Sequence, residues 1–193
     1  MRTLLLIVTL GAASCGESPP RGPVTPATTD AAPGACAIGG TSTLPGVSIA
    51  FPGAACTFTL AEAAHGIAIP YAVVVHDDLA NVVGAASDAG GCAQPGASGL
   101  IIGEAIGGGD QHYCICDTGL CPAPDPTPRA ITAGSYPGAF AWDGVNWNGP
   151  SDTGNPKGAP FPPGDYTVTI GAHGTHEGAA FAVTGTLVIH LVP

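Results

Sequence analysis

The chain has 193 residues, of which 9% are charged and 45% hydrophobic, and it contains 30 Gly and 20 Pro. Turns and extended segments must therefore outnumber long helices, and the hydrophobic content suffices for one folded domain. The formal net charge of -10 argues against a nucleic-acid partner, because binding phosphates requires clustered Lys and Arg.

The N-terminal segment has the pattern of a secretory signal peptide. Met1 and Arg2 precede an apolar run at residues 4–10 and a group of small residues that ends at Cys15. The run is too short to cross a bilayer. The sequence AASC at residues 12–15 resembles the lipobox of bacterial lipoproteins. This resemblance implies a signal peptide at residues 1–14 and acylation of Cys15, with palmitate among the expected chains.

The anchor implied by this resemblance is effectively permanent, since each buried methylene contributes about 0.8 kcal/mol to membrane affinity. Gly16 follows the cysteine, whereas lipoproteins kept in the inner membrane often carry Asp there, so the resemblance implies the outer membrane. The alternative is a free secreted protein that is cleaved near Cys15. We therefore expect an exported lipoprotein that faces the periplasm or the cell surface.

Residues 15–35 are expected to form a disordered tether, because they are rich in Pro, Thr and Ala and show no periodic apolar pattern. A single β domain follows at residues 36–193, where short apolar runs alternate with Gly, Pro, Asn and Asp clusters. Residues 61–64 are too few to predict a helix. The expected strands are 47–51, 56–60, 67–75, 100–102, 112–116, 139–142, 166–170 and 181–191.

Two segments near the C-terminus carry a second resemblance. Residues 140–144 read FAWDG and residues 161–168 read FPPGDYTV. They resemble the W-D-G … P-x-G-x-Y-T-V hairpin of bacterial immunoglobulin-like domains, such as those of the flagellar-hook capping protein and the BsuPI-type proteinase inhibitors. The resemblance implies an all-β fold, a single immunoglobulin-like β-sandwich, with Trp142 and Tyr166 as core aromatics on paired strands.

The same segments predict two turns. Asp143-Gly144 permits a tight exit from one strand, and Pro163-Gly164 sets the entry to the next. If Gly164 adopts a positive φ, a conformation that favours glycine, Gly164→Val should reduce the yield of folded protein.

Six cysteines follow Cys15, and an even number in an exported chain predicts disulfides. The sequence does not choose among the possible pairings. We predict Cys36 with Cys56, Cys92 with Cys114, and Cys116 with Cys121.

Metal binding is the alternative use of some of these residues. His112, Cys114, Cys116 and Cys121 offer ligands for zinc or cuprous copper, although the spacing is not that of paired C-x-x-C motifs. His173, His176 and Glu177 are better explained as a polar hairpin tip. Asp143, Asn146, Asn148 and Asp152 miss the spacing of a calcium loop. We therefore predict no metal and no cofactor.

Catalysis has no positive support in the sequence. It contains neither a G-x-S-x-G nucleophile elbow nor an H-E-x-x-H zinc motif, so we predict no enzyme and name no catalytic residue. Asp77 and Asp78 are paired carboxylates, but a hairpin turn explains them better. His65, His76 and His190 are isolated and receive no role.

The candidate ligand contacts are Trp147 and its polar neighbours Asn146, Asn148 and Asp152. An exposed aromatic with amides around it can stack on a sugar or anchor a protein partner. The alternative, which we favour, is that Trp147 folds back and caps the sandwich. The expected function is a membrane-anchored, noncatalytic binding or envelope-structural lipoprotein. The alternatives are an extracytoplasmic proteinase inhibitor and a periplasmic metal-binding protein.

Overall fold

The computed structural model describes residues 36–85, 94–115, 127–149 and 154–193. The chain divides into two units, residues 1–30 and 31–193, and every element below belongs to the second. The predictions for the signal peptide, for Cys15 and for the tether lie outside the described residues, as do Cys92, Cys116, Cys121 and Asp152. Within the described ranges, no helix is long and apolar enough to span a membrane.

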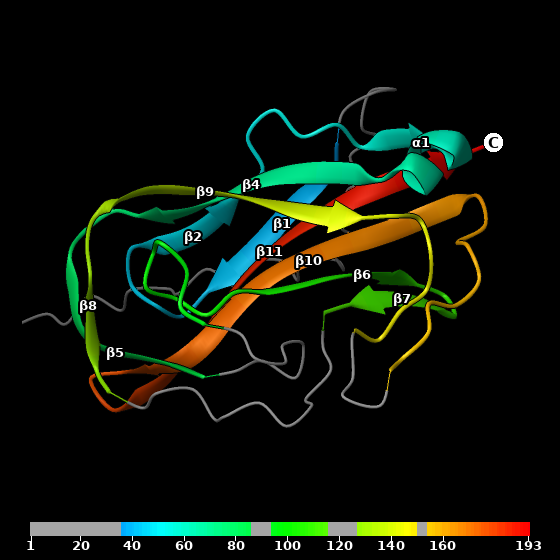
Figure 1. Cartoon of the computed structure of the whole chain (residues 1–193). Coiled ribbons are helices and arrows are strands. Elements are labelled where there is room, and N and C mark those ends of the chain that lie inside the picture. Colours follow the sequence, from blue (N-terminus) through cyan, green and yellow to red (C-terminus); the bar gives the residue numbers. More distant parts are fainter. Residues whose placement is uncertain (1–35, 86–93, 116–126, 150–153) are drawn as a thin grey trace, which may run out of the picture. The chain divides into compact units, whose positions relative to one another are not determined.

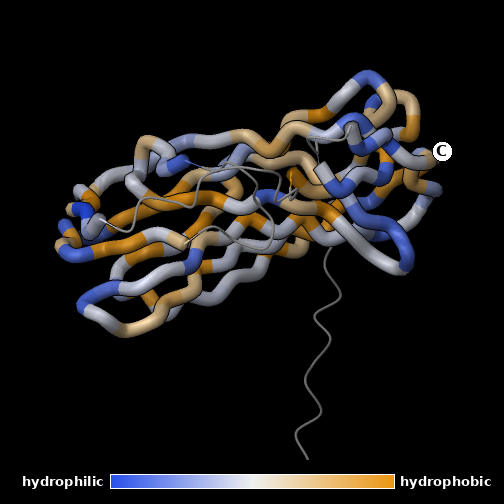
Figure 2. Tube along the Cα trace, turned by 60° about the horizontal axis from the view of Figure 1, so that its bottom comes forward, coloured by the Kyte–Doolittle hydropathy of each residue, from blue (hydrophilic) through white to orange (hydrophobic). Residues whose placement is uncertain are grey.

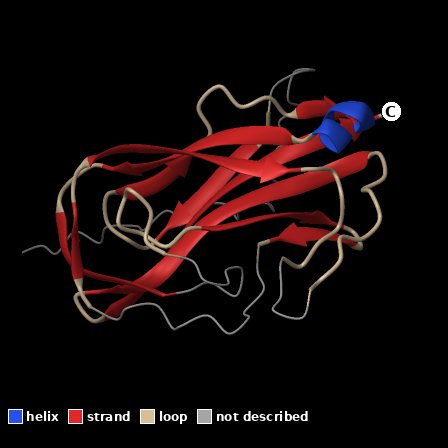
Figure 3. Ribbon diagram, in the orientation of Figure 1, coloured by secondary structure: helices blue, strands red, loops and turns tan. Residues whose placement is uncertain are grey.

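The described residues are mostly strands joined by loops, with one short helix (Figure 3). In chain order the elements are β1 (Ile38–Ser42), β2 (Val47–Ala50), β3 (Thr57–Thr59), α1 (Leu60–His65), β4 (Ile67–Val75), β5 (Leu79–Ala85), β6 (Gly103–Gly108), β7 (Gln111–Cys114), β8 (Arg129–Ile131), β9 (Gly134–Trp142), β10 (Gly164–His176) and β11 (Ala179–Val192). The all-β prediction is confirmed.

The strands form two sheets (Figure 1). The smaller sheet has the order β2-β4-β9, and the larger is centred on the antiparallel pair β10-β11. β1 and β3 pair with β11, while β5 and β6 pair with successive parts of β10. The chain thus alternates between sheets, with β4 and β9 in one and β5, β10 and β11 in the other. This is the connectivity of an immunoglobulin-like sandwich.

One core lies between the sheets. Every second residue of the long strands points inward, as the two-residue repeat of a strand requires, and hydrophobic residues recur along the strands (Figure 2). Ile69 and Phe140 of the smaller sheet and Leu187 of the larger are fully buried in the same cluster. A Cβ on Gly185 would stand 2.6 Å from Ile49 Cγ2, so a glycine lets the two sheets approach closely there.

Tyr166, near the start of β10, forms a tyrosine corner. The Tyr166 hydroxyl donates a hydrogen bond to the Pro162 carbonyl at 2.7 Å, four residues upstream. In immunoglobulin-like domains a tyrosine at this corner makes the same backward bond. Phe161 packs between Trp142 and Tyr166, with ring centroids 4.7 and 4.8 Å away. The two aromatics are therefore core residues, as predicted.

The expected hairpin around these aromatics is wrong. Trp142 ends β9 in the smaller sheet and Tyr166 lies on β10 in the larger, so the two strands belong to different sheets and do not pair. Gly164 opens β10 and is not among the residues with positive φ, so the condition for the Gly164→Val prediction is not met. Gly144 does have a positive φ, of 79°, at the predicted Asp-Gly exit.

Several other predictions can be compared with the strands. The strand at 67–75 is confirmed at both ends. The strand at 100–102 is wrong, because Leu100 and Ile101 lie buried in the irregular segment that precedes β6. The turn at Asp77-Asp78 is present but is not a hairpin, because it carries the chain from one sheet to the other. There the Asp78 carboxylate accepts the Ala133 amide at 2.6 Å.

The helix α1 is an element that the sequence analysis did not predict. Thr59 is its N-cap and forms a capping box with Glu62, in which each side chain bonds the other residue's backbone N–H. The spacing Thr-x-x-Glu is itself a helix-start signal. Gly66, with a φ of 92°, ends the helix. Two satisfied ends allow a six-residue helix to persist against the sandwich.

The predicted disulfide between Cys36 and Cys56 is present. It joins the residue where the domain begins to the residue before β3, and a loop of this length contributes about 3 kcal/mol in the chain-entropy model. Cys114 is also disulfide-bonded. The predicted pairings of Cys92, Cys116 and Cys121 lie outside the described residues.

Candidate functional site

Trp147, the main predicted ligand contact, is half-buried and packs against the core. Its indole N–H donates to the Asn155 carbonyl at 2.9 Å, and its ring centroid lies 5.7 Å from that of Tyr113. Lys157 Nζ lies over the ring, 5.3 Å from its centroid. In the structure Trp147 therefore caps the sandwich, the alternative that we favoured.

Asn146 holds the long β9–β10 connection against β7. Its side-chain oxygen accepts the His112 amide at 2.8 Å, while its Nδ2 donates to Gln111 Oε1 and to the Ala159 carbonyl. Asn146, Trp147 and Asn148 do line one hollow of about 260 Å³. However, the polar groups of Asn146 and the indole N–H are already bonded within the fold, which weakens their case as ligand contacts.

A larger hollow, here called the end groove, lies between α1, the β9–β10 connection and the end of β11. Its volume is about 450 Å³ and its walls are mostly apolar. The lining residues are Leu60, Ala63, Ala64, Asp143, Gly144, Val145, Pro160, Phe161 and Leu191. Apolar hollows of this size with few polar groups are the usual form of small-ligand sites.

The groove is built by a close contact between a loop and the helix. Gly144 has a positive φ, and a Cβ on it would stand 3.1 Å from the Ala63 Cβ, so only glycine allows this approach. The Phe161 amide donates to the Gly144 carbonyl at 2.8 Å, and Val145 bridges to Pro160. These bonds join the beginning and the end of the connection and fix its distance from α1.

Asp143 is the polar residue of the end groove. Its Oδ2 accepts from Lys157 Nζ, whereas its Oδ1 is buried and has no hydrogen-bond partner among the described residues. The pKa of Lys157 is raised, first by its bond to Asp143. Asp143 also borders a second hollow of about 420 Å³, which Tyr113, Trp142 and Lys157 help to line. Burial raises the pKa of Tyr113, and the charge of Asp143 adds to the effect.

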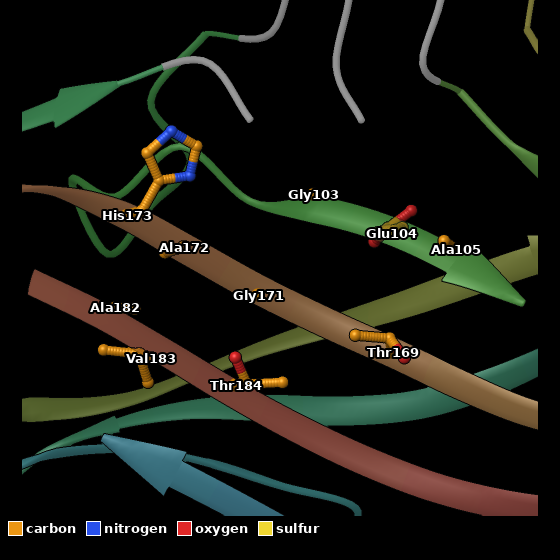
Figure 4. Close-up of a pocket in the computed structure, with 10 residues that line it drawn as sticks. All are labelled: Gly103, Glu104, Ala105, Thr169, Gly171, Ala172, His173, Ala182, Val183 and Thr184. Carbon is orange, nitrogen blue, oxygen red and sulfur yellow. The ribbon is translucent and has the colours of Figure 1, made fainter. Parts of the chain in front are cut away.

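A further hollow of about 200 Å³ lies over β6, β10 and β11 (Figure 4). Its wall includes Gly103 and Gly171, and His173 stands toward one end of it. Glu104 also belongs to the wall, but its carboxylate accepts the Tyr71 hydroxyl at 2.7 Å. Burial raises the pKa of Glu104 and of Tyr71. This pair links the two sheets and is fully explained by the fold.

The residues proposed as metal ligands have other roles where they are described. His112 Nε2 lies 3.0 Å from Cys114 Sγ, and Cys114 is disulfide-bonded, so it offers no thiolate. His173 and His176 lie at the end of β10, beside the two-residue tip Glu177-Gly178, which confirms the predicted hairpin tip. Over the described part of the chain, no group of three or more His, Cys, Asp or Glu is placed to hold a metal ion.

The sequence analysis missed the end groove, although it considered Asp143 as an oxygen ligand. Two sequence patterns belong to the segments that form the groove. The Asp-Gly pair predicts a turn and Thr-x-x-Glu predicts a helix start, but neither predicts that the turn and the helix lie in contact. No protein-family model, curated protein or solved structure matches the chain. Its function must therefore be inferred from the site itself.

Proposed function

We propose that this protein is an exported lipoprotein whose β-sandwich binds a ligand in the end groove without catalysing a reaction. The observation that carries the proposal is the end groove itself, a mostly apolar hollow of about 450 Å³ with Asp143 as its one titratable lining residue.

The proposed export and lipid anchoring rest on the sequence and on the disulfides. Residues 1–15 have the order of a lipoprotein signal, with Cys15 at the cleavage position. The Cys36–Cys56 disulfide and the bonded state of Cys114 suit an oxidising compartment outside the cytoplasm. Because the disulfide fixes residue 36 beside β3, the proposed tether joins the domain close to the strand that leads into α1.

Metabolic fatty-acid labelling tests the anchor. The wild-type protein should be labelled and should sediment with membranes, whereas Cys15→Ser should be unlabelled. Equal labelling of the two proteins would contradict lipidation at Cys15.

A pull-down from native envelope extract tests ligand binding in the groove. Ala64→Phe fills the groove from α1, and Ala61→Phe adds the same ring to an exposed position that does not line it. A component that wild type and Ala61→Phe retain should be lost with Ala64→Phe. If a component binds Ala64→Phe as well as it binds the wild type, its binding site lies outside the end groove.

The proteinase-inhibitor and metal-carrier functions stay predictions from the sequence. Titration against a panel of proteinases tests the first, and the metal content of protein made in the periplasm tests the second.

A further inference from the structure

The described disulfide sulfurs differ in the group that faces them. Cys36 and Cys56 are bonded to each other, and Cys36 Sγ lies 3.5 Å from the Ala54 carbonyl oxygen. Cys114 is bonded to a cysteine outside the described residues, and its Sγ lies 3.0 Å from His112 Nε2. One sulfur therefore faces a hydrogen-bond acceptor, whereas the other faces a ring nitrogen that can donate.

The strand β7 brings His112 and Cys114 together. Residues two apart on a strand point to the same face, so both side chains lie opposite the buried ring of Tyr113. The His112 amide donates to Asn146 Oδ1 at 2.8 Å, and the His112 carbonyl accepts the Trp147 amide at 3.0 Å, so the backbone that carries the ring is fixed. A disulfide sulfur has no proton, so its hydrogen bond with His112 requires the proton on Nε2.

Burial decides which sulfur leaves when this disulfide is reduced. Cys114 is 1% exposed, so an external thiolate must attack the other sulfur, and Cys114 Sγ takes the electron pair of the broken bond. The N–H of His112 then donates to a thiolate instead of a neutral sulfur, and hydrogen bonds to charged groups are the stronger ones. Stabilising the departing thiolate speeds the exchange and favours the reduced form at equilibrium.

The described contacts of β7 do not require the disulfide. The Cys114 amide donates to the Trp147 carbonyl at 2.9 Å, and β7 pairs with β6 along its length. The ring of Tyr113 packs against that of Phe140, with centroids 5.9 Å apart. Because these contacts persist when the S–S bond is broken, the bond can open without unfolding of the sandwich.

We propose that the Cys114 disulfide is redox-active and exchanges with an external dithiol, with Cys114 as the leaving thiolate and His112 as the residue that stabilises it. One thiolate of the dithiol forms a mixed disulfide with the cysteine bonded to Cys114, and the second thiolate then displaces that cysteine. The dithiol gives up two electrons and two protons and becomes a disulfide, while the two cysteines of this chain take them up. This inference goes beyond the proposed function, because it does not involve the end groove.

A redox titration of the wild-type mature chain tests the proposal, with the Cys36–Cys56 disulfide as an internal control. The protein is equilibrated near neutral pH with mixtures of reduced and oxidised dithiothreitol, and alkylation followed by mass spectrometry gives the reduced fraction at each cysteine. Cys114 should be half reduced at a ratio of reduced to oxidised reagent at least about tenfold lower than Cys36 and Cys56. A smaller difference, or the reverse order, would overturn the proposal.

Histidine variants test the role of His112 in the same titration. His112→Leu removes the ring donor and should move the Cys114 midpoint to a ratio about tenfold higher, about 30 mV more reducing, while the Cys36–Cys56 midpoint stays. His65→Leu, which changes a histidine bonded within α1, should move neither midpoint. Melting curves show whether each variant is folded, and His112→Thr, a residue that suits a strand, replaces His112→Leu if that variant is not. An unchanged Cys114 midpoint without the ring would overturn the role of His112.

Discussion

The buried hydrogen bond between Tyr71 and Glu104 lets us predict in which direction the stability of the fold changes with pH. Tyr71 projects from β4 across Gly138 of β9, where a Cβ would stand 2.4 Å from its ring, and reaches Glu104 on β6. Burial raises the pKa of Glu104 above its ordinary value of 4.5, while the Tyr71 bond opposes that effect. The folded state therefore holds the Glu104 proton more tightly than the unfolded state does.

The consequence is that stability depends on pH. The contribution of Glu104 is fully present below pH 4.5 and is lost as the pH rises through the raised pKa of the folded state. Glu104→Gln should remove this part of the dependence. Tyr71→Phe should move it to higher pH, because the bond that lowers the pKa of Glu104 is gone.

The size of the effect follows from the geometry. A hydrogen bond to a charged group contributes about 1.5–3 kcal/mol, and partial exposure of Glu104 to solvent reduces this to about 1 kcal/mol for Tyr71→Phe near neutral pH. Urea unfolding between about pH 4 and 8, followed by tryptophan fluorescence, measures the free energy of unfolding of both variants and of the double variant. The reasoning is refuted if Glu104→Gln keeps the wild-type pH dependence, or if Tyr71→Phe moves it to lower pH.

Three further predictions concern the elements that frame the end groove. Gly144→Ala should lower the free energy of unfolding by more than Gly154→Ala, because both glycines have positive φ but only Gly144 lies against α1. Equal losses in denaturant titrations would show that the close approach of Gly144 to α1 does not add to the cost. Tyr166→Phe should cost about 1 kcal/mol in the same assay, because the corner hydrogen bond is lost while the ring stays; an unchanged midpoint would show that the corner does not contribute. Replacing both Cys36 and Cys56 by Ser should cost about 3 kcal/mol, whereas a chelator should leave the wild-type melting temperature unchanged; a chelator-sensitive transition would favour the metal-carrier alternative.

Local patterns in the sequence determined much of the β architecture. The apolar run 67–75 and the alternating residues around Tyr166 specify strands because their period of two buries one face. The Asp143-Gly144 pair specifies a turn because glycine tolerates positive φ. Composition excluded long helices. The spacing of Thr59 and Glu62 is a capping-box pattern that indicates the short helix α1, although the prediction of elements did not use it.

Only the tertiary structure decided which strands pair and where a groove forms. The segments around Trp142 and Tyr166 look like a hairpin in sequence, but a turn pattern does not state whether the next strand joins the same sheet or the opposite one. Leu60, Asp143 and Leu191 meet at the end groove although the chain separates them widely. Gly144 of the β9–β10 connection lies against Ala63 of α1, and a contact between segments far apart in the chain leaves no local signature in a sequence.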